Sequence, residues 1–543
     1  MASVILQGFE IGVDNDTFHI PIILKWYQLP QFAHDAFVQS LRRYATPIFP
    51  FLSLFTNDRN LAAVLLAAQV LTRAATFFAL WELLKSCGVV AGRRVLAMAV
   101  LVVASGVYGE TAVGRDDLLV DSFTHTAVAQ AAALLGVAWL VRGELLKAAL
   151  AAGVAFDLNI FVGVWELAPL ATASLIRLVR APRTEIRPVV AAASGFTVLA
   201  APWALWTLAA QGSARVDFDF RAYLIDLYPY HFFIGWAPWS SRISLACTAL
   251  SGLVAAALLP RNGARAALAL ASFAAVFLGG ALLDRVVAWR FLLDLHLLRV
   301  DGLIQWMSAA LVAGGAASAL AGGRLAPLPG AAVAIAGLAG GLWWAALGGV
   351  ILCAVGTRAA SGRHRPALLA MRVPGGEAAA ASIVALAAVG LAVAAGRYHG
   401  PPPSPGPMET PSDAQLAGAA PRAPEWREVT DWARTTTPRR STFLIPLTLD
   451  FTFAQRVSWV GLKEGAAAMW APDTYDTWRS RSRAVGALRD AAAEMAYACG
   501  NHIDYVVLDR RPGHALAGAE ALAHPVFVNR WFAAFAPCAA ARA

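Results

Sequence analysis

The feature that most constrains this chain is a series of apolar runs long enough to cross a lipid bilayer. A membrane-spanning helix needs about 20 consecutive apolar residues. Only 15% of the 543 residues are charged, whereas a soluble domain carries about a quarter. The composition therefore excludes a soluble enzyme and a disordered chain, and predicts an all-α polytopic membrane protein of about ten to twelve spans. The runs lie near 61–83, 95–109, 122–141, 145–162, 163–178, 189–210, 232–259, 266–283, 302–320 and 378–396, with a further apolar stretch at 326–357.

Two regions leave the number of spans open. The stretch 326–357 is long for one helix and short for two, and the glycines of its AGLAGG segment suit a tight hairpin. If it is instead a single span, every later segment changes sides. The neighbouring runs 145–162 and 163–178 are both short for a membrane crossing.

The loops between the apolar runs alternate between two chemical kinds. By the positive-inside rule the basic loops are cytoplasmic, so the acidic loops are expected to meet on the outer face. The net charge of +9 therefore reflects membrane orientation and does not indicate a nucleic-acid partner. The basic loops carry Lys85, Arg93, Arg94, Arg142, Lys147, Arg177, Arg180, Arg183, Arg187, Arg261, Arg265, Arg324, Arg358, Arg363, Arg365 and Arg372. The acidic loops carry Asp14, Asp16, Glu110, Asp116, Asp117, Asp121, Asp157, Asp217, Asp219, Asp226, Asp284, Asp294 and Asp301.

The pattern divides the chain into four parts. Residues 1–60 are expected to be a first outer loop with amphipathic helices, and 61–396 the transmembrane domain. The Pro-rich composition of 397–424 predicts a semi-rigid linker. In 425–543 a helix–strand–helix–strand order predicts a small extracytoplasmic α/β domain.

That last part contains two cysteines, Cys499 and Cys538. They can form a disulfide if the domain lies outside the cytoplasm. The alternative is two unpaired buried thiols.

Polar residues in the first outer segment are candidates for chemistry. Asp14, Asn15 and Asp16 precede an apolar stretch, and His19 follows within one helical turn. A carboxylate at the mouth of a membrane cavity can act as a general base toward a hydroxyl, or bind a divalent metal. The alternative is a helix N-cap, in which the side chain satisfies free backbone N–H groups.

The second and third outer loops add further candidates. Asp116 and Asp117 can supply metal or base carboxylates, or can cap the next helix. The third loop mixes Arg221 and His231 with several tyrosines and tryptophans. Its aromatic rings suit a sugar or an isoprenoid, and they equally suit the interfacial aromatic belt, which does not explain Arg221 or His231.

The fourth outer loop carries Arg290 and Arg299 on an otherwise apolar run. Arginine on an outer segment departs from the positive-inside trend. An anionic partner accounts for it, because guanidinium binds phosphate in a bidentate fork. Ion pairing with Asp284, Asp294 and Asp301 is the alternative.

With these features the chain resembles the GT-C glycosyltransferases, membrane enzymes that use polyprenyl-phosphate sugars as donors. More narrowly, DNDTFHIPIILKWYQLPQFAHDAFVQS, LYPYHFF, FLLDLHLLRVDGLIQW and WREVTDWARTTTP are similar to segments of a bacterial family of GT-C-like membrane proteins. Members often have an aspartate before His-x-Pro in the first loop and a Pro-His-His-like loop later. The matching positions here are Asp16, His19, Pro21, Pro229, Tyr230 and His231, with Tyr230 in place of the second histidine.

The resemblance implies transfer of a sugar from a polyprenyl-phosphate donor to an acceptor at the outer face of the bacterial inner membrane. Asp16 or Asp14 would be the base, and Arg290 and Arg299 would hold the leaving phosphate. The remaining candidates for substrate binding are Asp116, Asp117, His231, Arg221 and His19. A divalent cofactor, Mg²⁺ or Mn²⁺, is left open, with Asp16, Asp117 and His231 as its candidate ligands. The alternatives are a flippase of lipid-linked sugars and a non-catalytic assembly subunit.

Overall fold

The computed structural model of the chain describes residues 1–12, 15–108, 111, 113–115, 118–211, 216–286, 290–320, 326–359, 424–510 and 523–538. These residues form two compact units. The helical unit comprises the described residues of 1–9, 65–205 and 229–400. The mixed unit comprises those of 10–64, 206–228 and 401–543.

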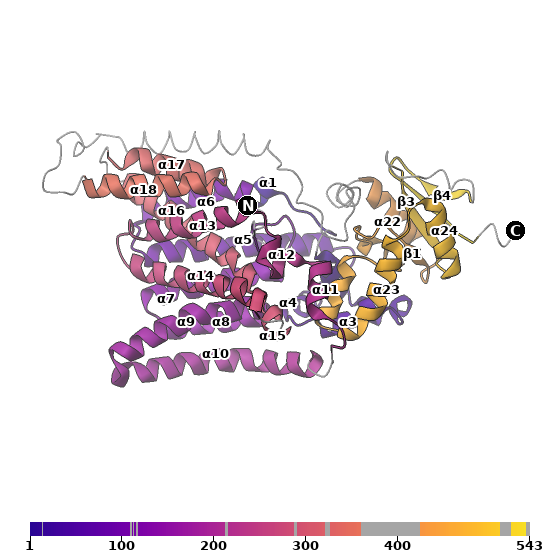
Figure 1. The fold of residues 1–543 in the computed structure, drawn as a ribbon, viewed down its shortest axis with the longest axis horizontal. Coiled ribbons are helices and arrows are strands. Elements are labelled where there is room, and N and C mark those ends of the chain that lie inside the picture. Colours follow the sequence, from indigo (N-terminus) through magenta and orange to yellow (C-terminus); the bar gives the residue numbers. More distant parts are fainter. Residues whose placement is uncertain are drawn as a thin grey trace. The chain divides into compact units, whose positions relative to one another are not determined.

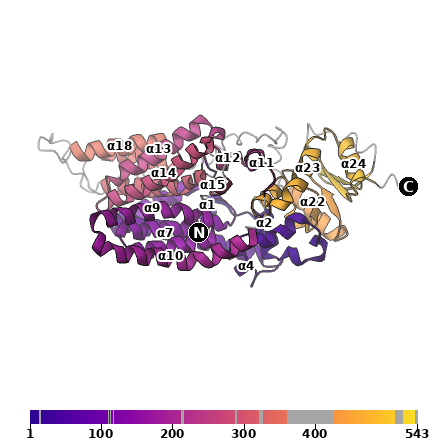
Figure 2. The ribbon, with the colours of Figure 1, turned by 60° about the horizontal axis from the view of Figure 1, so that its bottom comes forward.

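The helical unit is the predicted all-α membrane bundle. Among the described residues, six stretches are long and apolar enough to cross a membrane: Leu61–Ser86 (α5), His125–Arg142 (α7), Ile160–Arg180 (α9), Pro182–Gln211 (α10), Gly263–Leu283 in α14 (Gly263–Val286), and Arg290–Leu320, which contains α16 (Asp301–Leu320). Shorter helices complete the unit: α1 (Ala2–Gln7), α6 (Ala91–Ala104), α8 (Leu145–Leu158), α12 (Pro229–Phe232), α13 (Trp239–Ala256), α15 (Arg290–Asp294), α17 (Leu328–Ala339) and α18 (Trp343–Ala359). The run predicted at 378–396 lies outside the described residues. The helices succeed one another across the unit, with α18 against α13, α13 against α14, and α14 against α9 (Figure 2).

The ambiguous stretch 326–357 is a helical hairpin. Helices α17 and α18 lie side by side at one edge of the bundle (Figure 1). The chain turns between them at Gly340 and Gly341, and the φ of +69° at Gly341 is in the left-handed region that favours glycine. Of the two interpretations of the sequence, the structure therefore shows the hairpin, with Arg358 near the end of its second helix.

Small residues allow the helices of this unit to approach closely, as the high alanine content indicates. A Cβ at Gly330, Gly337 or Gly349 would overlap backbone atoms of the facing helix in the α17–α18 hairpin. At the α13–α16 contact, a Cβ on Gly252 would lie 2.5 Å from Ser308 Oγ. Helix α16 is buried along nearly its whole length, which makes it the centre of the bundle.

The two charged residues inside α5 each contact another element. Arg73 donates to the carbonyls of Leu118 and Val120, and Glu82 forms an ion pair with Arg142 of α7. Glu82 thus faces another helix, whereas Arg73 faces the loop that precedes α7. Charges inside a membrane segment are tolerated when they are paired in this way.

The basic loops meet at one end of the helical unit. Lys85 and Arg142 both pair with Glu82, Arg177 donates to the carbonyl of Gly143, and Arg265 donates to that of Val141. These contacts join the loops after α5, α7 and α9 and before α14. They agree with the alternation of loops predicted from the charge pattern.

The mixed unit is built around a five-stranded sheet with helices on both faces. The strands β1 (Thr442–Leu444), β2 (Val457–Ser458), β3 (Tyr505–Asp509), β4 (Pro525–Val528) and β5 (Phe532–Phe535) follow the order β2-β1-β3-β5-β4. β1 pairs parallel with β2 and β3, whereas β5 pairs antiparallel with β3 and β4. Helix α22 (Pro424–Thr436) covers one face, and α24 (Ala491–Gly500) covers the other (Figure 1).

The predicted small α/β domain is therefore present, with two differences in detail. The expected single helix between the strands is two helices, because Asp490 caps a new helix by accepting from the N–H of Ala493 at 2.8 Å. The first of them, α23, spans Tyr475–Gly486. The strands β2, β4 and β5 were not predicted, since runs of two to four residues carry little alternation.

Segments far from the tail in sequence complete this unit. From the first outer segment come α2 (Asp16–Ile23), α3 (Ala36–Ser40) and α4 (Ile48–Leu52), joined by short 3₁₀ turns, and α11 (Phe220–Leu227) comes from the third outer loop. Tyr223 on α11 is fully buried and donates its hydroxyl hydrogen to the carbonyl of Gly465 at 2.8 Å. Residues 10–64 are thus part of the same compact unit as the described residues of the tail.

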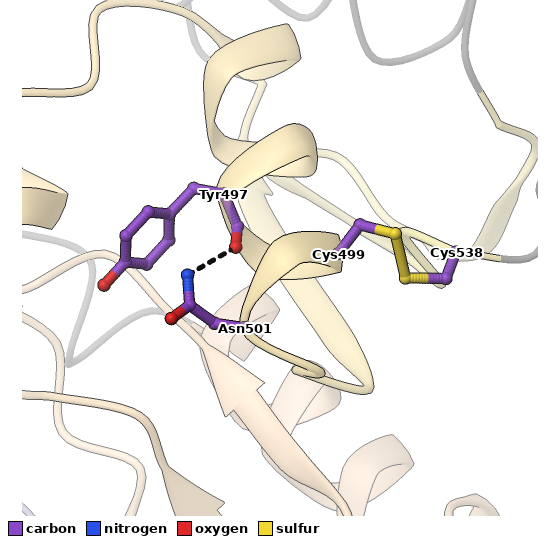
Figure 3. The surroundings of a disulfide bond; sticks show 4 residues. All are labelled: Tyr497, Cys499, Asn501 and Cys538. Carbon is purple, nitrogen blue, oxygen red and sulfur yellow. Dashed lines mark hydrogen bonds between the residues drawn. A yellow bond between two sulfur atoms is a disulfide. The ribbon is translucent and has the colours of Figure 1, made fainter.

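Cys499 and Cys538 form a disulfide with a Cα–Cα distance of 5.2 Å (Figure 3). Cys499 lies in α24, and Cys538 follows β5. The bond ties the end of the described chain to a helix of the sheet. Of the two sequence alternatives, the structure shows the paired one.

Candidate functional site

Asp16, the first predicted base, is a buried carboxylate at the start of α2 and is 2% exposed. The N–H of Gly12 donates to its Oδ2 at 2.7 Å, and Nδ1 of His19 lies 3.8 Å from its Oδ1. The N-cap residue is Asn15, whose side chain makes no capping hydrogen bond. Asp16 therefore does not occupy the N-cap position, and its carboxylate faces a histidine one helical turn later. Asp14 lies outside the described residues.

A second carboxylate, Asp450, lies close to Asp16. The hydroxyl of Thr17 donates to Asp450 Oδ2 at 2.5 Å, and the N–H of Thr452 donates to Oδ1 at 2.7 Å. Burial raises the pKa of Asp450 to about 6, and the negative charge of Asp16 raises it further against the effect of these hydrogen bonds. Sequence reasoning missed Asp450 because 433 residues separate it from Thr17, and its own surroundings carry no motif.

Two further acidic groups extend this carboxylate cluster. Burial raises the pKa of Glu464 to about 8, and the negative charges of Asp35 and Asp450 add to the effect. Burial likewise raises the pKa of Asp35 to about 6, although its Oδ1 accepts from the N–H of Val38 at 2.8 Å. Groups that hold protons near neutral pH can exchange them with a bound hydroxyl.

In the helical unit, three of the loops predicted to lie on the outer face meet around Gly114. Its N–H donates to Asp301 Oδ2 at 2.7 Å, and its carbonyl accepts from Nδ1 of His231 at 2.7 Å. Asp301 is fully buried at the start of α16. A Cβ at position 114 would lie 2.5 Å from the carbonyl oxygen of Leu298, so the close approach of these loops requires glycine.

Positive charge gathers at this junction. The guanidinium groups of Arg115 and Arg299, together with the rings of His231 and His296, form what we call the cationic cluster. Burial lowers the pKa of His231 well below its usual value, and the charges of Arg299 and Arg115 lower it further. His231 is therefore neutral at physiological pH. Because a carbonyl can only accept, its Nδ1 carries the hydrogen and its Nε2 is an acceptor.

Aromatic rings contact two side chains of the cationic cluster, Arg115 and His296. The guanidinium of Arg115 lies 4.5 Å from the ring centroid of Tyr230, the residue that stands where a second histidine was expected. The ring of His296 packs against Phe232 at 4.5 Å and Phe161 at 4.2 Å. Both Arg115 and His296 have positive φ, an uncommon conformation that is often found at functional sites.

An apolar crevice adjoins the cationic cluster. Phe232 follows His231 in the chain, and Leu298 precedes Arg299, so the crevice and the cluster share two loop segments. The crevice is lined by Phe232, Gly280, Leu283, Leu292, Leu293, Leu297 and Leu298. Its volume is about 20 Å³, which is room for about one water molecule.

The other predicted site residues are divided between the two units or lie outside the described residues. Arg290 forms an ion pair with Asp294 at 3.2 Å. Arg221 lies on α11 and His19 on α2, both in the mixed unit, whereas Arg290, Arg299 and His231 belong to the helical unit. Asp116 and Asp117 lie outside the described residues.

Among the described residues, no three His, Cys, Asp or Glu side chains are grouped closely enough to hold a metal ion. Of the candidate ligands, Asp16 and His231 belong to different units, and Asp117 is not described. The described residues therefore do not themselves form a Mg²⁺ or Mn²⁺ site.

No family model and no curated protein matches the sequence. Among solved structures, the chain is similar to the crystal structure of ArnT from Cupriavidus metallidurans bound to undecaprenyl phosphate. The match has a TM-score of 0.45 and 14% sequence identity, and it covers 99% of this chain and 96% of that one. At this identity and TM-score, any function has to be argued from the residues of this chain.

Proposed function

We propose that the chain is a GT-C-like glycosyltransferase. It transfers a sugar from a polyprenyl-phosphate donor to an acceptor hydroxyl at the outer face of the inner membrane. The observation that carries this proposal is the cationic cluster in the loops of a membrane bundle. Cations on an outer loop run against the usual charge distribution, and they suit a lipid phosphate.

In the proposed reaction, the acceptor oxygen forms a bond to the anomeric carbon while the bond from that carbon to the phosphate oxygen breaks. Asp16 takes the hydroxyl proton. Arg299 and Arg115 stabilise the negative charge that develops on the departing polyprenyl phosphate. His231, neutral and held by Gly114, offers an uncharged hydrogen-bonding group beside them.

The predicted location of the mixed unit belongs to the same proposal. A disulfide between Cys499 and Cys538 persists in an oxidising compartment, which supports placing this unit in the periplasm or outside the cell.

The test uses the purified full-length protein in nanodiscs with a panel of radiolabelled polyprenyl-phosphate sugars. Asp16→Asn removes the base and is expected to lower transfer about 10²–10⁴-fold while donor binding is unchanged. Arg299→Gln is expected to weaken donor binding. Matched controls are Asp476→Asn and Arg187→Gln, because both side chains are exposed in the structure.

Full transfer activity of Asp16→Asn would show that Asp16 is not the base. If no polyprenyl-phosphate sugar binds to the wild-type protein, the donor assignment is wrong. Donor binding without transfer to any acceptor, in the wild-type protein, would favour the flippase.

A further inference from the structure

The mixed unit contains a cavity of about 210 Å³ that none of the proposed catalytic groups occupies. One wall comes from the first outer segment and the other from α22 and the 3₁₀ turn that follows Asp450. The cavity is smaller than the roughly 300–1,000 Å³ of pockets for drug-sized ligands, so it suits a single ring. It is lined by Ile20, Leu24, Trp26, Asp58, Leu61, Arg427, Thr430, Asp431, Arg434, Thr452, Phe453 and Gln455.

The apolar part of the lining is aromatic and aliphatic. Trp26 is 5% exposed and stacks on Phe32, with 5.1 Å between the ring centroids and an interplanar angle of 3°. The ring of Phe453 packs directly over Gly12, where a Cβ would overlap it. Both rings are thus held in place, and both residues line the cavity.

The polar part carries no net charge. Two arginines, Arg427 and Arg434, are balanced by two aspartates, Asp58 and Asp431. Asp431 pairs with Arg434 at 2.8 Å, and one oxygen of Asp58 accepts from Gln455 Nε2 at 3.0 Å. The two aspartates would repel an anionic ligand, and the two arginines would repel a cationic one. An uncharged polyol would meet neither repulsion.

These groups include both donors and acceptors of hydrogen bonds. The guanidinium of Arg427 makes no hydrogen bond or ion pair to any residue that the structure describes, so its five N–H groups are available. The carboxylate of Asp431 can accept more hydrogen bonds than the one from Arg434. Adjacent donors and acceptors of this kind match neighbouring hydroxyl groups, each of which donates and accepts.

The walls are fixed before any ligand binds. Arg456 is buried, and it donates to the carbonyls of Arg434 at 2.7 Å and Thr437 at 2.8 Å, at the C-terminal end of α22. It thereby holds the turn containing Gln455, a residue with a φ of +49°. Binding to such a preformed site loses less conformational entropy.

The Asp58 turn is fixed as well. The N–H of Asn57 donates to Oδ1 of Asn60 at 2.7 Å, and the N–H of Asn60 donates to Oδ1 of Asn57 at 3.2 Å. Asn side chains stabilise turns in this way. Asp58 therefore presents its carboxylate from a defined position on the wall opposite to α22.

We propose that this cavity binds one uncharged pyranose residue of a glycan. The aromatic and aliphatic lining would cover the apolar face of the ring, and Arg427, Asp431 and Asp58 would hydrogen-bond its hydroxyls. Thr452 links the cavity to the carboxylate cluster, because it lines the cavity and its N–H donates to Asp450. Only the role of this sugar as part of the acceptor rests on the proposed transferase function; its binding does not.

The test is saturation-transfer NMR on the full-length protein in nanodiscs, with no lipid donor present. The probes are methyl glucoside, methyl galactoside and methyl mannoside at millimolar concentration, with methyl glucuronide and glucose 1-phosphate as charged counterparts. At least one neutral glycoside is expected to bind. Arg427→Gln and Asp431→Asn are each expected to weaken it about tenfold, the effect of one hydrogen bond to a charged group. Arg440→Gln, on an exposed residue outside the lining, should leave binding unchanged.

Three results would overturn the proposal. They are binding of no neutral glycoside, binding that neither cavity variant weakens, and binding of the charged probes alone. Because Arg427 and Asp431 are exposed on a helix surface, loss of folding is not expected, and an unchanged melting temperature verifies this. Since no transfer is measured, these results are independent of the test of Asp16.

Discussion

A substitution at Gly114 tests whether the three outer loops are held together as the structure shows. In Gly114→Ala, the new methyl group would lie 2.5 Å from the carbonyl oxygen of Leu298 and 2.8 Å from Oδ1 of Asp301. The first neighbour is backbone, so the 113–115 segment has to move. That movement breaks two hydrogen bonds of 2.7 Å, from the Gly114 N–H to Asp301 and from His231 to the Gly114 carbonyl.

The size of the effect follows from these two bonds. A hydrogen bond to a charged acceptor contributes about 1.5–3 kcal/mol, and a neutral one contributes about 0.5–1.5 kcal/mol. Water can replace part of these hydrogen bonds when the loop is displaced. We therefore expect the loop arrangement that binds the donor to be destabilised by a net amount of about 2–3 kcal/mol. If binding requires this arrangement, affinity for polyprenyl phosphate falls roughly 30- to 150-fold.

The assay is equilibrium binding of polyprenyl phosphate to the protein in nanodiscs. The matched control is Gly235→Ala, since a Cβ at that position in the third outer loop meets nothing within 4 Å. We expect the control to bind as the wild type does. Wild-type affinity in Gly114→Ala would refute the view that this loop junction forms the phosphate site, and equal loss in the control would make the effect non-specific.

Two further predictions concern the mixed unit. Because the folded-state pKa of Glu464 is raised to about 8, from 4.5, this group stabilises the fold below about pH 4.5, and its contribution is lost as the pH rises through about 8. The melting temperature of Glu464→Gln is therefore expected to fall less than that of the wild type as the pH rises from about 4.5 to about 8. Identical pH profiles of the two proteins would contradict this. The Cys499–Cys538 disulfide spans 39 residues and should contribute about 3–4 kcal/mol in the chain-entropy description. Reduction, or Cys499→Ser with Cys538→Ser, should lower the urea midpoint of the mixed unit, and thiol labelling without a reductant should detect neither cysteine.

The membrane bundle could be predicted because its signals are local. Apolar length identifies a helix such as α5 or α14 without reference to any other part of the chain. The alternation of basic loops also agreed with the structure, since Arg142, Arg177 and Arg265 lie at one end. By contrast, hydropathy could not decide whether 326–357 is one helix or two. The hairpin depends on the left-handed backbone conformation of Gly341, and hydropathy carries no information on backbone angles.

The mixed unit shows where local signals are insufficient. Helix α22 was predicted, and Trp426, Val429 and Ala433 are buried on one face as their spacing indicated. No pattern in the sequence shows that residues 10–64 join the tail, because this depends on contacts such as Thr17 to Asp450 and Trp470 to Ser40. The carboxylate cluster and the sugar-sized cavity both arise from that joining, so neither could be predicted.

The acidic residues of the predicted outer loops have different roles in the two units. From the sequence, their number makes carboxylates the expected reactive groups. In the helical unit, however, Asp301 accepts from the backbone of Gly114, and Asp294 pairs with Arg290. These acids position loops, whereas Arg115 and Arg299 lie close enough to His231 to lower its pKa. A histidine kept neutral beside two guanidinium groups adds no further repulsion between cations, and a phosphate is the partner that best compensates their charge. The acids of this unit thus support an anion site, and the carboxylates suited to proton transfer lie in the mixed unit.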